Sequence, residues 1–198
     1  MDTGAIPADS TNKITSQINR FGFLFISNEI IILIVYNLTM KIRIIAIGKI
    51  KDDYLKEGIS SYLVKLKRYA DVYVHEVMDS SLPDNPNQSE IEKAKNTEGE
   101  RVLKILKPSD YVINLDLNKK EFSSEEFSSY LIKSLEKAGA NLTFLIGGSY
   151  GLSDELKKRA NDAISLSKMT FLHQMTRLIL LEQIYRAFKI NAHEIYHK

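Results

Sequence analysis

The chain has 198 residues, 44% of them hydrophobic, and no cysteine. A chain of this length can bury one substantial core, so we expect a single main domain without disulfides, thiolate zinc sites or a cysteine nucleophile. The formal net charge of +2 is too small to indicate nucleic-acid binding by itself.

The first 39 residues differ in character from the rest. Residues 1–17 are polar and lack periodicity, which is typical of a flexible tag or linker. Residues 21–36 are strongly apolar, but this run of 16 residues is shorter than the ~20 that a membrane-spanning helix needs. No small-residue cleavage site of a signal peptide precedes Met40. We therefore expect residues 1–39 to be a non-native or disordered leader, and residues 40–198 to form the domain.

From residue 41 onward, strand-like and helix-like segments alternate. Runs rich in Ile, Val and Leu predict strands, and apolar residues at helical spacing predict helices. The expected strands are 41–47, 72–77, 111–116, 141–146 and 163–166, with a loop at 117–120; the expected helices are 53–69, 89–106, 123–138, 153–161 and 174–189. Such alternation predicts an α/β fold, a mostly parallel sheet with helices on both faces.

The first expected helix has a basic flank. Its basic residues are Lys51, Lys56, Lys65, Lys67 and Arg68. A charged flank is usually a solvated face, and contact with RNA is the alternative interpretation.

The segment 141–153 has the pattern of a buried strand that runs into a ligand loop. The strand is followed by Gly147 and Gly148 and, after two further residues, by Gly151. Glycines allow positive φ and leave backbone amides uncovered, so this loop can approach a small molecule closely. The spacing matches neither the dinucleotide fingerprint nor the P-loop, and an ordinary tight connection is the alternative.

Three loops follow expected strands at the same edge of the predicted sheet. They are residues 115–119, 147–151 and 167–173. Open α/β sheets bind ligands at the carboxyl ends of their strands. We therefore expect the three loops to converge on one small-molecule site.

The last expected helix carries apolar side chains on all sides. The sheet can cover one face, and a second copy of the chain the other, most simply in a two-fold homodimer. Its polar residues Arg177, Glu182 and Arg186 form a structural ion pair at that interface or act directly in catalysis. His193 and His197 are four residues apart, but no third ligand is evident, so we expect no metal site.

Five segments carry a family resemblance when they are taken together. They are Leu115-Asp116, Phe144 to Leu152, Leu166 to His173, Glu182 to Phe188 and Tyr196 to Lys198. Any one segment is weakly specific, but five in this order are strongly so. Over residues 40–198 the chain resembles the RlmH family, small SPOUT-class methyltransferases that act on a pseudouridine of bacterial large-subunit ribosomal RNA.

The resemblance implies a homodimer, a SPOUT-type C-terminal trefoil knot and S-adenosylmethionine as the methyl donor. The residues that would line or shape the cofactor pocket are Leu115, Gly147, Gly148, Gly151, Leu166, Ser167, Lys168, Met169, Thr170 and Phe171. The chain departs from the family at Asn118, where glycine is usual, and at Leu172, where proline is usual. Both departures bear on loop conformation beside the cofactor.

The resemblance also implies the reaction, methylation of N3 of a pseudouridine in 23S ribosomal RNA of the assembled ribosome, in the cytoplasm. A protonated imide nitrogen is a poor nucleophile, so a base or a stabilising cation is needed. We expect Tyr196 and His197 to reach the partner subunit's site, with Arg177 near the developing charge.

Two other interpretations remain open. The chain could be a dimeric RNA- or ribosome-binding protein of the same fold without activity, in which Asn118 and Leu172 mark the decay of the pocket. Alternatively, the chain could be an enzyme of another kind that uses the same pocket. In none of these do we expect a membrane or a metal ion as a partner.

Overall fold

The computed structural model describes residues 40–139 and 141–195. In this part of the chain, five parallel strands form one sheet in the order β2-β1-β4-β3-β5. The strands are β1 (Lys41–Ile47), β2 (Asp71–Val77), β3 (Tyr111–Lys120), β4 (Asn141–Ile146) and β5 (Asp162–Ile164). The helices are α3 (Asp53–Leu66), α4 (Gln88–Leu103), α5 (Ser124–Ala138), α6 (Asp154–Arg159) and α7 (His173–Asn191).

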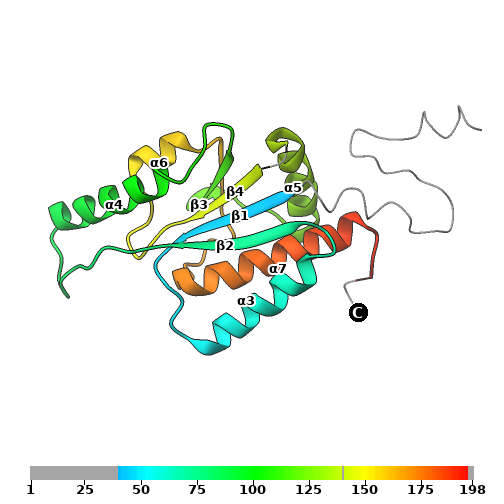
Figure 1. Cartoon of the computed structure of the whole chain (residues 1–198), viewed down its shortest axis with the longest axis horizontal. Coiled ribbons are helices and arrows are strands. Elements are labelled where there is room, and N and C mark those ends of the chain that lie inside the picture. The colour runs from blue at the N-terminus through cyan, green and yellow to red at the C-terminus, as the bar shows by residue number, and fades with distance from the viewer. Residues whose placement is uncertain (1–39, 140, 196–198) are drawn as a thin grey trace, which may run out of the picture.

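The sheet separates two apolar cores. Successive side chains of a strand point to opposite faces, and β1 follows this rule. Ile42 and Ile44 pack in the core with α3, α5 and α7, whereas Ile45 and Ile47 pack in the core with α4 and α6. Figure 1 shows α3 and α7 on the opposite side of the strands from α4 and α6. The predicted α/β fold with helices on both faces is therefore confirmed.

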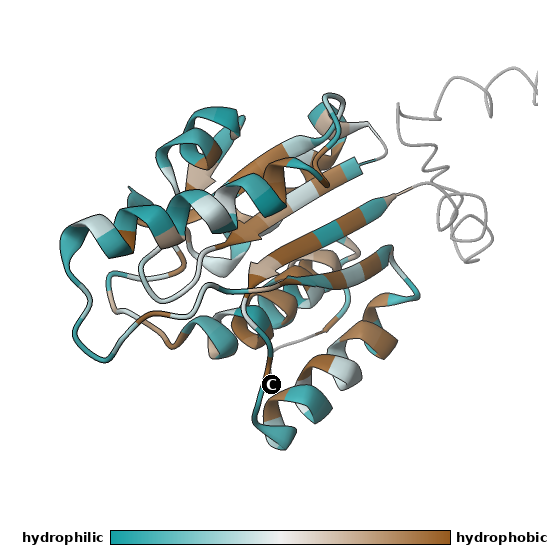
Figure 2. Cartoon of the chain, turned by 60° about the vertical axis from the view of Figure 1, so that its left-hand side comes forward, coloured by the Kyte–Doolittle hydropathy of each residue, from teal (hydrophilic) through white to brown (hydrophobic). Residues whose placement is uncertain are grey.

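Hydropathy along the chain matches this layering. The strands are largely hydrophobic, as their brown colour in Figure 2 shows, whereas the outer helix α4 is largely teal. Within residues 40–139 and 141–195, none of the helices has the length and apolar character needed to cross a bilayer. The expected leader, residues 1–39, and the expected catalytic residues Tyr196 and His197 lie outside the described residues.

Every expected strand and helix is present, with ends displaced by a few residues. The N-cap of α5 is Ser123, as the sequence predicts, and it forms a capping box with Glu126. The start predicted for α4 was wrong by one residue, because its capping box uses Asn87 and Glu90. Capping chemistry therefore sets both helix starts.

The loop expected at residues 117–120 is instead the end of β3. Its four side chains are exposed and all but Leu117 are polar, so the sequence lacks a strand pattern there, but its backbone still pairs with β5. The pairing shifts register between Leu115 and Lys120, and the carbonyl of Lys120 accepts a hydrogen bond from the Ser165 amide at 2.9 Å. This irregularity displaces residues 116–119 from the ladder at the edge where the loops gather.

Gly99, in the interior of α4, is explained by the approach of α6. A Cβ at this position would lie 2.3 Å from Oγ of Ser153, the buried N-cap of α6. The glycine thus weakens the helix locally but allows α4 and α6 to pack closely.

We predict that Gly99→Ala destabilises the protein by about 1–3 kcal/mol, because the methyl group either clashes with Ser153 or displaces its capping hydroxyl. Helix propensity alone predicts the opposite, a gain in stability of about 1 kcal/mol. Denaturant unfolding measures the free energy of unfolding of the variant relative to wild type. Asn96→Ala, an exposed substitution on the same helix, is the matched control. A Gly99→Ala protein as stable as wild type would contradict this account of the packing.

Candidate functional site

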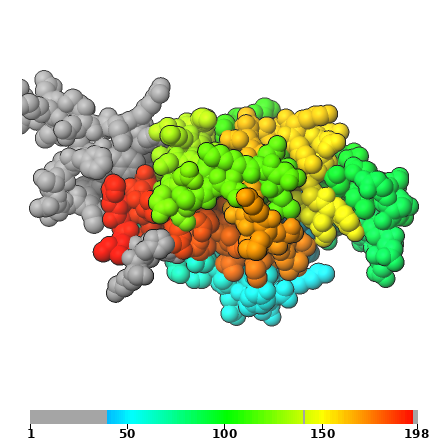
Figure 3. Space-filling model, turned by 180° about the vertical axis from the view of Figure 1, so that it is seen from behind, coloured from blue at the N-terminus to red at the C-terminus, as the bar shows by residue number. Residues whose placement is uncertain are grey.

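The carboxyl ends of β3, β4 and β5 surround a cavity of about 580 Å³. Its walls come from three segments, between residues 115 and 118, 146 and 152, and 165 and 173, together with Lys157 of α6 and Thr176 of α7. In Figure 3 these parts of the chain, coloured green, yellow and orange, lie side by side on one face. The three expected loops therefore do converge, and the volume falls in the usual range for small-molecule sites.

The glycine loop is a tight turn that only glycine can form at two positions. A Cβ on Gly147 would lie 2.7 Å from the carbonyl carbon of Gly151, far inside contact distance. Gly151 has φ of 81°, a left-handed value that side chains disfavour, and its amide donates to the carbonyl of Gly148 at 3.1 Å. The turn leaves main-chain groups in the cavity wall, where a ligand can bind them.

The third loop is held by its own serines. The hydroxyl of Ser165 donates to the carbonyl of Ser167 at 2.9 Å, and the hydroxyl of Ser167 accepts from the amide of Met169 at 3.0 Å. With the Lys120 carbonyl bound to Ser165, these bonds connect the third loop to the end of β3. The loop is thereby shaped before any ligand is present.

Nine of the ten residues expected to bind the cofactor line this cavity. They are Leu115, Gly147, Gly148, Gly151, Leu166, Ser167, Met169, Thr170 and Phe171. The tenth, Lys168, is exposed and is not part of the wall. Asn118 and Leu172, where the chain departs from the family pattern, both lie in the wall.

Three polar residues of the wall lie outside the three expected loops, Ser165, Lys157 and Thr176. Ser165 lies in the last expected strand, two residues before the third loop. Thr176 lies three residues after His173, on the same side of α7, and helical spacing could have found it. Lys157 belongs to a short helix beside the glycine loop and had no such signal.

His173 lies in the cavity wall, and its pKa is shifted by its surroundings. It is the first residue of α7, and its Nε2 lies 3.4 Å from where a Cβ of Gly48 would be. Burial, and then the charges of Arg177 and Lys51, lower the pKa of His173 below 6.5, with Asp79 opposing. The imidazole is therefore mainly neutral at pH 7 and able to accept a proton.

Arg177, one turn after His173, is wholly buried and bound within its own subunit. Its Nη2 donates to the carbonyls of Ile47 at 3.0 Å and Gly48 at 2.9 Å, and its Nη1 donates to Glu76 at 2.9 Å. The same carboxylate oxygen of Glu76 accepts from the amide of Ile50 at 3.0 Å. Burial lowers the pKa of Arg177, and the charge of Glu76 opposes that effect.

The polar residues of α7 do not form one ion-pair cluster. Arg177 pairs with Glu76 of β2, whereas Arg186 pairs with Glu182 one turn earlier on α7, at 2.5 Å. The predicted grouping of the three as a single interface pair is therefore wrong for Arg177, because its guanidinium is turned toward the sheet.

The apolar surface of α7 is covered largely from within the subunit. The helix packs between α3 and α5 against the sheet, and Leu180, Leu181 and Ile184 are fully buried there. The all-round apolar pattern is thus explained mostly by intrasubunit packing. By itself it no longer indicates a dimer.

Two residues of the basic flank near α3 have partners in the same subunit. The ammonium of Lys65 lies 4.8 Å from the centre of the Tyr62 ring, and Arg68 donates to Glu194 at 3.2 Å. For these two residues the structural interpretation gains support over direct RNA contact. In the described part of the chain, no group of three or more His, Asp or Glu residues could hold a metal ion.

Comparison with known proteins gives a consistent family. Residues 40–197 match the family described as "Predicted SPOUT methyltransferase". The ribosomal RNA large subunit methyltransferase H of Carboxydothermus hydrogenoformans is 52% identical over 159 residues, which are 80% of this chain and the whole of the relative. Proteins with the same name from Halothermothrix orenii and an Exiguobacterium species are 49% and 46% identical, again over 80% of this chain and their whole length.

We predict that His173 makes stability depend on pH. The pKa of His173 in the folded protein lies below 6.5, so the unfolded chain binds the proton more readily than the folded protein does. The free energy of unfolding is therefore unaffected by His173 above pH 6.5 and decreases as the pH falls from 6.5 toward the folded pKa. His173→Gln should therefore lose less unfolding free energy than wild type between pH 7 and pH 5. Denaturant unfolding across this range tests it, with His75→Gln, at an exposed position of β2, as control. Parallel profiles for wild type and His173→Gln would contradict the prediction.

Proposed function

This chain belongs to the SPOUT methyltransferase family, and we propose that it transfers the methyl group of S-adenosylmethionine to N3 of a pseudouridine in 23S ribosomal RNA. The observation that carries the proposal is the cavity of about 580 Å³ at the carboxyl ends of β3, β4 and β5, closed by the glycine loop. The names of relatives that are 46% to 52% identical over their whole length support the substrate class.

The residues of the cavity suit a nucleoside-containing cofactor. Apolar side chains of Leu115, Leu166 and Phe171 offer surface for a base, while serine and threonine hydroxyls and the main chain of the glycine loop offer hydrogen bonds. The cofactor supplies an already activated methyl group. What remains for the protein is to hold the acceptor nitrogen in line with that group and to exclude water.

The acceptor nitrogen must lose its proton, and the described part of the cavity wall contains one imidazole, that of His173. Its lowered pKa keeps it mainly neutral at pH 7, so it is a third candidate base beside Tyr196 and His197. Arg177 acts through His173, because its buried charge lowers the pKa of His173 and its hydrogen bonds to the end of β1 fix the start of α7. Arg177 is therefore a positioning residue and does not itself contact the charge that develops on the substrate.

The chain leaves α7 at the end opposite the cavity. His173, in the cavity wall, and Lys189 are separated along α7 by roughly 24 Å at 1.5 Å per residue. The amide of Glu194 bonds to the carbonyl of Lys189 at 3.0 Å, so Glu194, two residues before Tyr196, also lies at that end.

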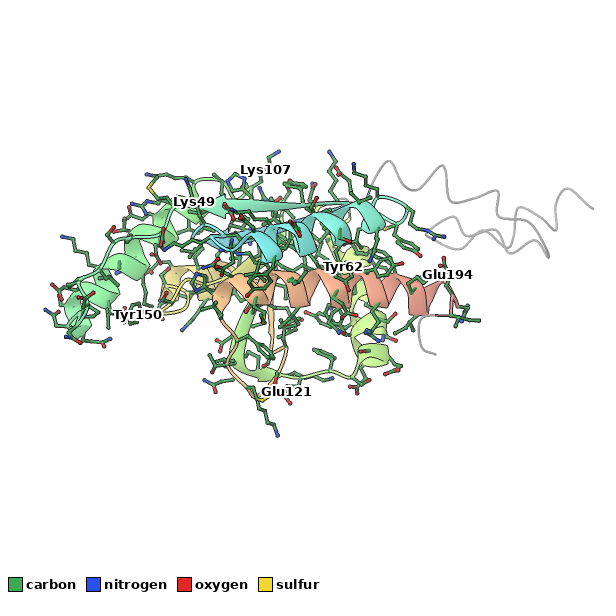
Figure 4. The ribbon with its side chains drawn as sticks, turned by 90° about the horizontal axis from the view of Figure 1, so that it is seen from below. Lys49, Tyr62, Lys107, Glu121, Tyr150 and Glu194 are labelled. Carbon is green, nitrogen blue, oxygen red and sulfur yellow. The ribbon has the colours of Figure 1, made fainter. Side chains whose placement is uncertain are left out.

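We therefore propose that Tyr196 and His197 act in the cavity of another subunit. A two-fold homodimer brings the tail of each copy to the cavity of the other, so the complete site requires both subunits. Figure 4 shows this separation, with Tyr150 of the glycine loop beyond the start of α7 and Glu194 at its far end.

The remaining expectations belong to the same proposal. The catalytic domain is residues 40–198, preceded by an extension of 39 residues, and the family match over residues 40–197 supports this boundary. The C-terminal trefoil knot stays a prediction. In this proposal the protein acts on assembled ribosomes in the cytoplasm.

Mass spectrometry of ribosomal RNA tests the reaction. Ribosomes from cells that lack this protein, incubated with the purified protein and S-adenosylmethionine, should gain one methyl group on a 23S pseudouridine. Protein truncated before Tyr196 should bind the cofactor but transfer no methyl group. Full turnover by the truncated protein would remove the tail from the mechanism. Ribosome binding without methylation would favour the inactive binding protein.

We predict that Gly147→Ala weakens S-adenosylmethionine binding at least tenfold, because its Cβ would displace Gly151 and reshape the loop. Isothermal titration calorimetry measures the affinity, and circular dichroism checks the fold. Tyr150→Ala, at an exposed site in the same loop, is the control and should bind normally. Unchanged affinity of Gly147→Ala would show that the cofactor lies elsewhere.

A further inference from the structure

The wall of the cavity contains few charged side chains. Besides His173, its described residues include one acidic side chain, that of Asp116, and one basic side chain, that of Lys157. The imidazole of His173 is mainly neutral, and the other polar side chains of the wall are hydroxyls and the amide of Asn118. The wall thus offers one anion and one cation to a ligand.

The two charged residues lie on the same side of the cavity. The side-chain amide of Asn114 on β3 donates to the carbonyl of Leu156 on α6 at 3.4 Å, and Asn114 is buried, so the end of β3 packs against α6. Asp116 comes two residues after Asn114. Lys157 comes directly after Leu156. The anion and the cation therefore enter the wall from two neighbouring elements.

Both charged groups are available to a ligand. The ion-pair partner of Lys157 among the described residues is Asp154, at the long distance of 3.9 Å, and the two side chains are 47% and 73% exposed. Such exposed pairs are weak, so the ammonium can leave Asp154 for a better acceptor at little cost. Oδ1 of Asp116 accepts from the amide of Asn118 at 3.1 Å, which leaves Oδ2 for a donor on the ligand.

We propose that Lys157 binds the carboxylate of the methionyl part of S-adenosylmethionine and so orients the cofactor in the cavity. This inference rests on the proposed function. The methionyl part carries one carboxylate and one ammonium group, and Asp116, on the same side, offers an acceptor for the ammonium. A carboxylate that enters the cavity loses water, and a cation replaces that water better than neutral hydroxyls do.

Lys157→Met gives the first test, because it keeps an unbranched apolar side chain and removes the charge. Isothermal titration calorimetry should show that it binds S-adenosylmethionine about tenfold more weakly than wild type, the loss expected for one charge-assisted hydrogen bond. Lys157→Arg, which keeps the charge, should retain most of the affinity. Lys158→Met is the matched control, since Lys158 is exposed on the same helix and is not part of the wall. Equal affinities of Lys157→Met and Lys158→Met would overturn the proposal.

A second ligand separates recognition of the carboxylate from an indirect effect on the fold. Decarboxylated S-adenosylmethionine lacks the carboxylate but keeps the ammonium, the sulfonium and the nucleoside. Wild type should bind it about tenfold more weakly than S-adenosylmethionine, whereas Lys157→Met should bind both ligands equally, because each change removes the same contact. A preference for the carboxylate that persists in Lys157→Met would refute the inference. Wild-type protein that binds neither ligand would instead refute the proposed function itself.

Discussion

A single buried guanidinium fixes the relation between the sheet and the last helix. Arg177 is fully buried, and a buried charge is tolerated only where acceptors replace the water it has lost. The acceptors are the carbonyls of Ile47 and Gly48 at the end of β1 and the carboxylate of Glu76. A shift of α7 along the sheet would leave this buried guanidinium without its acceptors, which would destabilise the fold. His173, one turn earlier, is consequently held against the cavity.

Fixing the start of α7 also fixes its end, because a helix is a stiff rod. The 19 residues of α7 carry the chain from the cavity to the cluster of Tyr69 and Glu194. The two ends of α7 are therefore held separately, the start by the sheet and the end by the segment that follows α3.

The sequence alone predicted the structure correctly where a single local pattern determines it. Ile-rich runs between helical segments predicted the strands, and the crowding of Gly147 against Gly151 shows why glycines marked the ligand loop. It was insufficient where distant partners decide the structure. The end of β3 looks like a polar loop because its side chains are solvated, and only its backbone pairing with β5 makes it a strand. Arg177 on α7 gave no sign that it turns toward the sheet, since its acceptors lie about 100 or more residues away along the chain. The bond between Glu194 and Tyr69 was equally hidden, at a separation of 125 residues.

The use of arginine bears on how an RNA substrate would be held. Arginine is the preferred residue for bidentate contacts with phosphates and bases. All six arginines in the described residues donate to acceptors of the protein itself: Arg43, Arg68, Arg101, Arg159, Arg177 and Arg186. Contacts with the RNA backbone then fall mainly to lysines, which act as point charges without directional preference. With so few arginines available for phosphate contacts, we expect recognition of the proposed substrate to rely on the shape of the RNA more than on its charge.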